Sequence, residues 1–306
     1  MGVQANDLIF YEDPEEEKGS LRLRIFRNLL LGWAMFISVA GVGVVSLLIL
    51  FPPGEAIFRS IFNDACERGP VHTANIDIGD ATVLQIIGDR GDLAVEGRRG
   101  RSSISVVGRS CGTIESRRHF ESIVFTTSKT DDEIIVAVKL PRKANLGELQ
   151  DNIRMDVQIL VPENFPRVEI DNGDGSVFVA NVRELQAVVG FGNLDATNIG
   201  GAVDVDELIG SISLIDIRGD VEVDDLKGYG EVFLTAITGN VNIGSNQSGP
   251  ARISDIGGDV TIGNAGTGRL TVARVGGDLS VDLNLLGRIS IDEIEGLVSL
   301  PGDPGT

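Results

Sequence analysis

The sequence predicts an all-β fold: a parallel β-solenoid, or β-helix, of roughly 19-residue coils, preceded by a single N-terminal transmembrane helix. Three observations predict this fold class. A 23-residue run without a charge lies near the N-terminus, a motif with two glycines recurs at a nearly constant interval in the C-terminal half, and alternating aliphatic residues separate the glycines. Only 5% of the residues are aromatic and 39 are glycine, which suits many short strands joined by tight turns.

Residues 29–51 form the predicted transmembrane helix, because an apolar helix needs about 20 residues to cross the hydrocarbon core. Basic residues precede the run and are expected to stay on the cytoplasmic side: Lys18, Arg22, Arg24 and Arg27. The sequence therefore predicts a single-pass protein with a short cytoplasmic leader, residues 1–28, and an extracytoplasmic C-terminal domain. A cleaved signal peptide is the alternative, although its apolar core would be shorter, about 7 to 15 residues.

Residues 52–72 are expected to link the membrane span to the exterior domain. Four apolar side chains there have helical spacing: Ile57, Phe58, Ile61 and Phe62. Such a helix could lie on the membrane surface or pack on the following domain, and the sequence leaves both open.

The repeat of the C-terminal half is marked by one glycine per unit, at intervals of 18 to 20 residues: Gly192, Gly210, Gly230, Gly249, Gly268 and Gly287. An alternating strand follows each one and meets a second glycine: Gly200, Gly219, Gly239, Gly257, Gly276 and Gly296. A unit of this kind cannot bury its apolar face alone, but stacked copies form continuous internal rows. Residues 164–300 are therefore predicted to form the solenoid. Residues 73–163 are expected to be a β region that caps it, and residues 301–306 a tail whose Pro301 and Pro304 close the other end.

A row of polar residues is expected at the second corner of each coil: Asp220, Asn240, Asp259 and Asp278. Their side chains are expected to accept hydrogen bonds from backbone amides at the bend, as in an Asx turn. A calcium-binding ladder is the alternative, but the motif of calcium-loaded solenoids is absent. We therefore predict a structural row and no metal site.

The order of these features resembles the bacterial putative-adhesin family of extracytoplasmic β-strand repeat proteins. The resemblance rests on a strand that ends in a proline, "MDVQILVPENF", a glycine corner in "RVEIDNGDGSVFV", and the repeated glycine units, and it spans residues 74–300. It implies an adhesin-like β-solenoid that is often tethered to a membrane. It implies no catalytic residues.

Cys66 and Cys111 are the only cysteines, and both are predicted to lie outside the cytoplasm, where a disulfide between them would persist. A zinc site with His72 and His119 is the alternative, but its ligand spacing departs from the usual compact pairs.

Seven arginines crowd into 29 residues and could form an anion-binding patch: Arg90, Arg98, Arg99, Arg101, Arg109, Arg117 and Arg118. The alternative is a solvated surface in which acidic neighbours pair with these arginines.

The exterior domain shows no catalytic constellation and no cofactor motif. Carboxylates that a polysaccharide-cleaving β-helix could use are present in the repeats, but no Lys or Arg recurs beside them: Asp204, Asp206, Glu222, Asp224 and Asp225. Aromatic platforms for sugars are few, since the repeat units from Gly173 onward hold only Phe178, Phe191, Tyr229 and Phe233.

The sequence therefore predicts a membrane-anchored, extracytoplasmic solenoid that acts as a non-catalytic binding or structural module of the cell envelope. The alternatives are a polysaccharide-processing β-helix enzyme and a self-assembling envelope scaffold. The expected partners are the cell membrane, through the chain's own helix, and envelope polymers, lipid headgroups or another envelope protein. The net charge of −19 argues against a nucleic-acid partner.

Overall fold

The computed structural model describes residues 66–114, 116–141, 153–246, 249–283 and 287–301. The chain divides into two units, Met1–Ala56 and Ile57–Thr306, and every described residue belongs to the second. The predicted leader and membrane span lie outside the described residues. Within the described part, no helix has the length and apolar character needed to span a membrane.

The described chain is almost entirely β-structure, as the sequence predicts. Its first part contains β1 (Glu67–Asp77), β2 (Val83–Arg90), β3 (Leu93–Arg98), β4 (Ser103–Gly112), the 3-10 helix η1 (Arg117–Ser122), β5 (Val124–Lys129), β6 (Glu133–Lys139) and β7 (Arg154–Pro162). Strand β1 takes in residues 67–72, so the end of the expected linker is a strand and not a helix.

The repeats contribute fifteen further strands. These are β8 (Phe165–Asp174), β9 (Val177–Ala180), β10 (Val182–Phe191), β11 (Leu194–Ile199), β12 (Val203–Ile209), β13 (Ile212–Ile217), β14 (Val221–Lys227), β15 (Val232–Ile237), β16 (Val241–Asn246), β17 (Ala251–Ile256), β18 (Val260–Asn264), β19 (Leu270–Val275), β20 (Leu279–Leu283), β21 (Ile289–Ile294) and β22 (Val298–Ser299).

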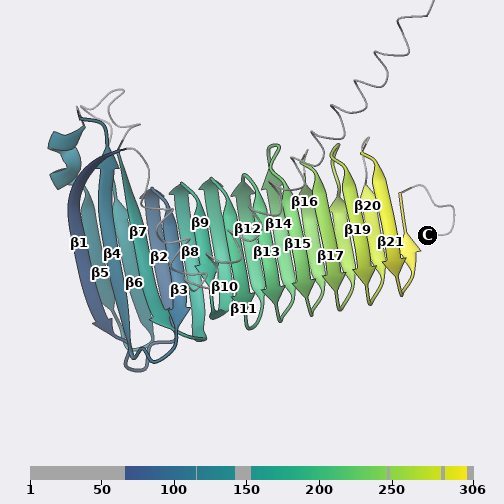
Figure 1. Ribbon diagram of the computed structural model, residues 1–306, viewed down its shortest axis with the longest axis horizontal. Coiled ribbons are helices and arrows are strands. Elements are labelled where there is room, and N and C mark those ends of the chain that lie inside the picture. The colour runs from purple at the N-terminus through teal and green to yellow at the C-terminus, as the bar shows by residue number, and fades with distance from the viewer. Residues whose placement is uncertain (1–65, 115, 142–152, 247–248, 284–286, 302–306) are drawn as a thin grey trace, which may run out of the picture. The chain divides into compact units, whose positions relative to one another are not determined.

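These strands form two sheets that face each other across one core. The first sheet has the order β1-β4-β7-β3-β9-β11-β13-β15-β17-β19-β21, and we call it sheet A. The second, sheet B, has the order β22-β20-β18-β16-β14-β12-β10-β8-β2-β6-β5. From β9 onward each coil places one strand in each sheet, in parallel register with the coils on either side, so about seven coils stack along one axis (Figure 1).

Residues 73–163 do more than cap the stack, because two of their strand pairs are coils of it. Strand β3 lies between β7 and β9 in sheet A, and β2 lies between β6 and β8 in sheet B. The stacking order is therefore β6 with β7, then β2 with β3, then the repeats, and this differs from the order along the chain. Antiparallel strands β1, β4 and β5 complete this end.

The core consists of aliphatic rows, one residue per coil. In the six-residue strands of sheet A from β11 to β19 the first, third and sixth side chains point inward. Leu194, Ala196 and Ile199 in β11 are at most 2% exposed, and the same positions are buried in every coil up to β19. Because neighbouring strands are about 4.8 Å apart, equivalent side chains touch along the whole stack.

Two columns of glycine run along the corners, where one coil lies against the next. The first matches the sequence prediction. A Cβ on Gly268 would lie 1.9 Å from the carbonyl oxygen of Gly249, and a Cβ on Gly249 would lie 1.6 Å from that of Gly230. The second column differs from the prediction in three coils, because the stacked residue is the following glycine. It consists of Gly201, Gly219, Gly239, Gly258, Gly277 and Gly296.

A third corner is built from residues other than glycine. In sheet A the fifth position of each strand from β11 to β21 has a positive φ, from Asn198 at 53° and Asp216 at 59° to Ala236, Arg274 and Glu293. The ladder skips this residue, so Thr197 pairs with Ile215 and Ile199 pairs with Ile217. The strand therefore bends there and returns its sixth side chain to the core.

The close approach of the coils makes the first glycine column intolerant of side chains. We expect Gly268→Ala to lower the free energy of unfolding by about 2 kcal/mol or more, because the backbone of Gly249 must move. Gly200→Ala is the matched control, since the nearest atoms to its Cβ are 3.8 Å away, and it should change the stability by less than about 1 kcal/mol. Urea denaturation followed by circular dichroism measures both, and equal effects would contradict the stacking argument.

Candidate functional site

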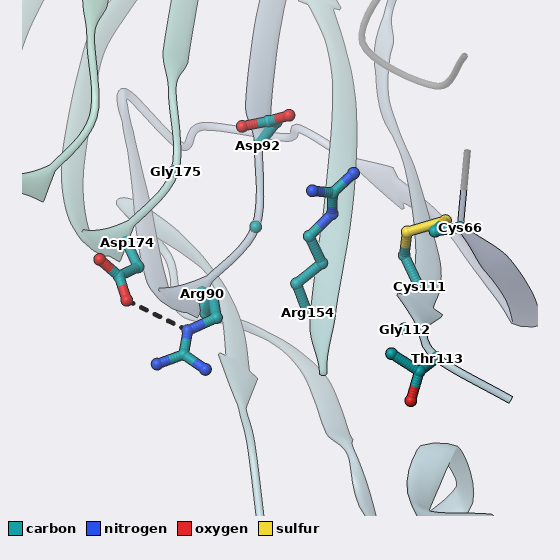
Figure 2. Close-up of a pocket in the computed structure, with 10 residues that line it drawn as sticks. Cys66, Arg90, Asp92, Cys111, Gly112, Thr113, Arg154, Asp174 and Gly175 are labelled. Atoms are coloured by element: carbon teal, nitrogen blue, oxygen red, sulfur yellow. Dashed lines mark hydrogen bonds and ion pairs between the residues drawn. A yellow bond between two sulfur atoms is a disulfide. The ribbon is translucent and has the colours of Figure 1, made fainter. Parts of the chain in front are cut away.

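Several charged groups line a recess of about 500 Å³ where the N-terminal strands join the first coils (Figure 2). The turn between β2 and β3 forms one wall, and the ends of β1 and β4 form the other. Its lining consists of Cys66, Arg90, Gly91, Asp92, Cys111, Gly112, Thr113, Arg154, Asp174 and Gly175.

A disulfide between Cys66 and Cys111 forms one wall of the recess, and it is the pairing that the sequence predicts. The two Cα atoms are 5.7 Å apart, and Cys111 is 2% exposed. Cys66 immediately precedes β1, and Cys111 is the next-to-last residue of β4. The bond therefore holds the start of the edge strand β1 against its neighbour.

We expect loss of this disulfide to lower the free energy of unfolding by roughly 3 to 4 kcal/mol, because it closes a loop of 45 residues. The variant Cys66→Ala/Cys111→Ala should unfold at a lower urea concentration than the oxidised protein. Reductant should bring the unchanged protein to the level of the variant and leave the variant itself unaffected. A midpoint that does not respond to reductant would contradict this role.

The charged groups of the recess are bound to one another. Arg90 pairs with Asp174 at 3.1 Å, and Arg154 pairs with Asp156 at 3.2 Å. The carboxylate of Asp92 accepts a hydrogen bond from the backbone amide of Ser176 at 2.9 Å. In turn, the amide of Asp92 donates to the carboxylate of Asp156 at 3.1 Å. The recess thus ties the N-terminal strands to the first repeats, and its arginines have acidic partners in place.

The seven arginines of the predicted anion patch do not come together in the structure. Arg98 pairs in register with Pro162, and Arg109 lies opposite Asp156 on the same strand β7, six residues away. At about 3.3 Å per residue these positions are about 20 Å apart. Strands β3 and β4 therefore carry Arg98 and Arg109 toward opposite ends of the sheet.

Most of these arginines contact a nearby partner. The contacts are Arg90 to Asp174, Arg98 to Glu96, Arg99 to Glu163, Arg117 to Glu67, Arg101 to the carbonyl of Ser103, and Arg118 to the ring of His119. Pairing with acidic neighbours is the alternative that the sequence left open.

The polar corner row forms a ladder between coils. The side-chain oxygen of Asp220 accepts the backbone amide of Asn240 at 2.7 Å, that of Asn240 accepts the amide of Asp259, and that of Asp259 accepts the amide of Asp278. Asp278 then accepts the amide of Leu297. These residues bind backbone amides, as expected, but the amides belong to the next coil and not to the residue's own bend.

The residues of the possible zinc site are separated. Cys66 and Cys111 are joined to each other, the ring of His72 packs against Phe125 at 5.6 Å, and His119 accepts a hydrogen bond from Arg118. Among the residues that the structure describes, no three His, Cys, Asp or Glu side chains are arranged to hold a metal ion.

A groove of about 860 Å³ follows the column of positive φ across five coils. Its charged residues are Asp216, Asp255, Arg274, Glu293 and Glu295. Arg274 binds Asp255 through two hydrogen bonds of 2.6 and 2.8 Å. This guanidinium holds the pKa of the Asp255 carboxyl well below its usual range. The groove is therefore acidic, with its single arginine engaged.

The outer face of sheet A carries two of the aromatic residues of the repeats, Phe178 and Phe233. Phe178, Asp195, Ser213 and Phe233 form one outward row, each opposite the next in parallel register. Phe233 is 36% exposed, and Ile215 beside this row is 38% exposed. Desolvation raises the pKa of the Asp195 carboxyl. At the adjoining corner Phe191 and Tyr229 are 61% and 87% exposed. We use the name aromatic face for the surface formed by these residues: Phe178, Asp195, Ser213, Phe233, Ile215, Phe191 and Tyr229.

The outer face of sheet B is acidic. Asp204 lies opposite Glu222 in the ladder, and burial followed by repulsion from Asp206 and Glu222 raises its pKa. Lys227 binds both Glu207 and Asp225 at the next positions. The carboxylates named in the sequence analysis thus gather on one open sheet face.

Comparison with models of known protein families gives no match, and no curated protein matches. Several solved structures match this chain at low identity. One is a putative adhesin from Bacteroides fragilis, at 13% identity and a TM-score of 0.34, covering 76% of this chain and 97% of the other. A putative lipid-binding protein from Parabacteroides distasonis gives 15% identity and a TM-score of 0.37, covering 74% and 98%.

A putative adhesin from Parabacteroides merdae gives 16% identity and a TM-score of 0.32, covering 74% of this chain and 97% of the other. These proteins carry the names of adhesins or binding proteins and not of enzymes.

Proposed function

We propose that this protein is a non-catalytic binding module of the cell envelope, which presents the aromatic face to an extended envelope polysaccharide. The observation that carries the proposal is the exposure of Phe233, Tyr229 and Phe191, with Ile215, on the outside of the stack. Exposed apolar clusters on a folded protein mark interaction sites. Aromatic rings beside a carboxyl and a hydroxyl group suit a ligand with apolar faces and polar edges, as a sugar ring has.

The solenoid suits an extended partner because its surface repeats. Each strand from β9 to β19 is hydrogen-bonded on both sides, so the outer row is held rigid and little conformational entropy is lost on binding. Successive residues of the row are about 4.8 Å apart. A polymer that lies along the stack can therefore contact several coils.

The location outside the cytoplasm has separate support. A disulfide persists in an oxidising compartment, and the basic residues before residues 29–51 favour an N-terminus in the cytoplasm. The same run serves in this proposal as the membrane anchor.

Binding is tested with purified full chain in detergent against a panel of envelope polysaccharides and against anionic lipid vesicles. We expect Phe233→Ala to weaken polysaccharide binding about tenfold, because the loss of an aromatic contact costs on the order of 1.4 kcal/mol. The matched control is Thr261→Ala, an exposed outward residue of sheet B. Equal affinity of the two variants, or binding to vesicles alone, would contradict the proposal.

The acidic face of sheet B supports a second candidate function, a polysaccharide-processing enzyme, because the pKa of the Asp204 carboxyl is raised beside other carboxyl groups. The same polysaccharide panel distinguishes it. Release of new reducing or unsaturated ends, abolished by Asp204→Asn, would favour the processing enzyme over the binding module.

The proposed orientation predicts that a protease added outside intact cells, after removal of any outer barrier, cleaves the domain that follows residue 57. A tag at the N-terminus should stay protected under the same conditions. Protection of the C-terminal domain would place it in the cytoplasm and overturn the proposed location.

A further inference from the structure

The last coil exposes positions that are buried in every coil before it. Leu270, Val272 and Val275 of β19 are at most 2% exposed, but their successors Ile289, Ile291 and Ile294 in β21 are only partly buried. In β22 Val298 is 42% exposed, and Leu297 just before it is 78% exposed. The apolar cross-section of the solenoid is therefore open at this end of the described chain.

The backbone is open at the same place. Strand β21 pairs with β19 and strand β22 pairs with β20, and neither has a second neighbour among the described residues. Their outer N–H and C=O groups form a free sheet edge, which pairs readily with another strand. Pro301 limits the donors that follow β22, but it leaves the apolar side chains of β21 uncovered.

At the opposite end of sheet A the edge strand β1 is protected, so it is a poor partner for the edge of β21. There, Phe120 at 1% and Ile123 at 5% exposure close the core. The edge strand β1 contains Pro70, and its register is irregular between Arg68 and Val71. Head-to-tail stacking into filaments is therefore disfavoured, and the open end of a second copy is the better match.

We propose that two copies of this chain join tail to tail through β21, related by a twofold axis. An isologous contact of this kind pairs β21 with itself in antiparallel orientation. In such a pair, residues that lie opposite each other point to the same face of the sheet. The register can therefore be centred on Ser290 or on Ile291.

The sequence of β21 selects between these two registers. Centred on Ser290, the pairing places Ile289 opposite Ile291 on the core face and Arg288 opposite Asp292 on the outer face, each twice by symmetry. Centred on Ile291, it would place Ile289 opposite Glu293, whose positive φ interrupts the strand. The Ser290 register uses the regular part of the strand and pairs opposite charges.

This contact joins two molecules and then stops, because the protected ends face outward. It differs in this respect from a coil-to-coil scaffold, and it does not depend on the proposed polysaccharide binding.

A cysteine cross-link in the full chain, in its own membrane, tests the geometry. Two Ser290 residues at the axis would have Cα atoms about 5 Å apart, within the range of a disulfide. We expect Ser290→Cys to give a reducible dimer under mild oxidation. Thr271→Cys is the matched control, one coil inward in the same outward row. Its two copies would be three strand spacings apart, about 14 Å, and should not cross-link.

Two outcomes of this experiment would overturn the proposal. One is the absence of a cross-link at Ser290→Cys when the thiol still reacts with maleimide. The other is equal cross-linking at both positions.

Charge exchange tests the register independently, by sedimentation of the full chain in detergent. Arg288→Asp creates two like-charge pairs and should raise the dimer dissociation constant about tenfold. Arg288→Asp/Asp292→Arg should restore it. The control Arg269→Asp, at the equivalent position one coil earlier, should leave it unchanged. A monomer at all concentrations would refute the dimer. Dimerisation only after residues 302–306 are deleted would refute it as well, because it would show that these residues cover the edge.

Discussion

Backbone pairing between successive coils, at a distance of one strand spacing, is the constraint on which the rest of this structure depends. It makes the corners so tight that a Cβ on Gly249 or Gly268 would overlap the carbonyl group of the coil before it. It also brings the side chain of each corner residue within hydrogen-bond distance of the next coil's amide, from Asp220 to Leu297. The glycine columns and the polar ladder are therefore two consequences of the same separation.

The same pairing explains why the N-terminal region belongs to the solenoid. Strands β2 and β3 offer the first repeat a partner of the shape that another repeat would offer, and β6 with β7 continue the stack beyond them. The buried residues form one continuous core from Ala81 to Val281. The recess beside the disulfide lies where these coils meet the antiparallel strands, which is why its charged groups serve as ties between segments distant in the chain.

Function in such a fold must come from what the stack leaves outside. The inward positions are used by the core, and the corners are used by glycine and by the ladder. Outward positions are free to vary. In sheet A, from β9 to β15, they carry part of the aromatic face, whereas in β12 and β14 of sheet B they carry carboxylates. The end of the stack at β21 is another exposed surface. Its side chains are apolar because they follow the core pattern of the repeat.

The sequence by itself determined the all-β solenoid, its period and the first glycine column, because each of these depends on local alternation or on spacing. It left a disulfide between Cys66 and Cys111 open beside a zinc site, and the tertiary structure decided for the disulfide. Tertiary structure alone decided the stacking order of β2, β3, β6 and β7, since which coil lies against which depends on contacts between residues distant in the chain. It also decided the positive φ of Ala236, Arg274 and Glu293, which the local preferences of these residues oppose and the neighbouring coils impose. Arg98 and Arg109 show the same limit. They are close in the sequence, but their partners on β7 are six residues apart, which is about 20 Å.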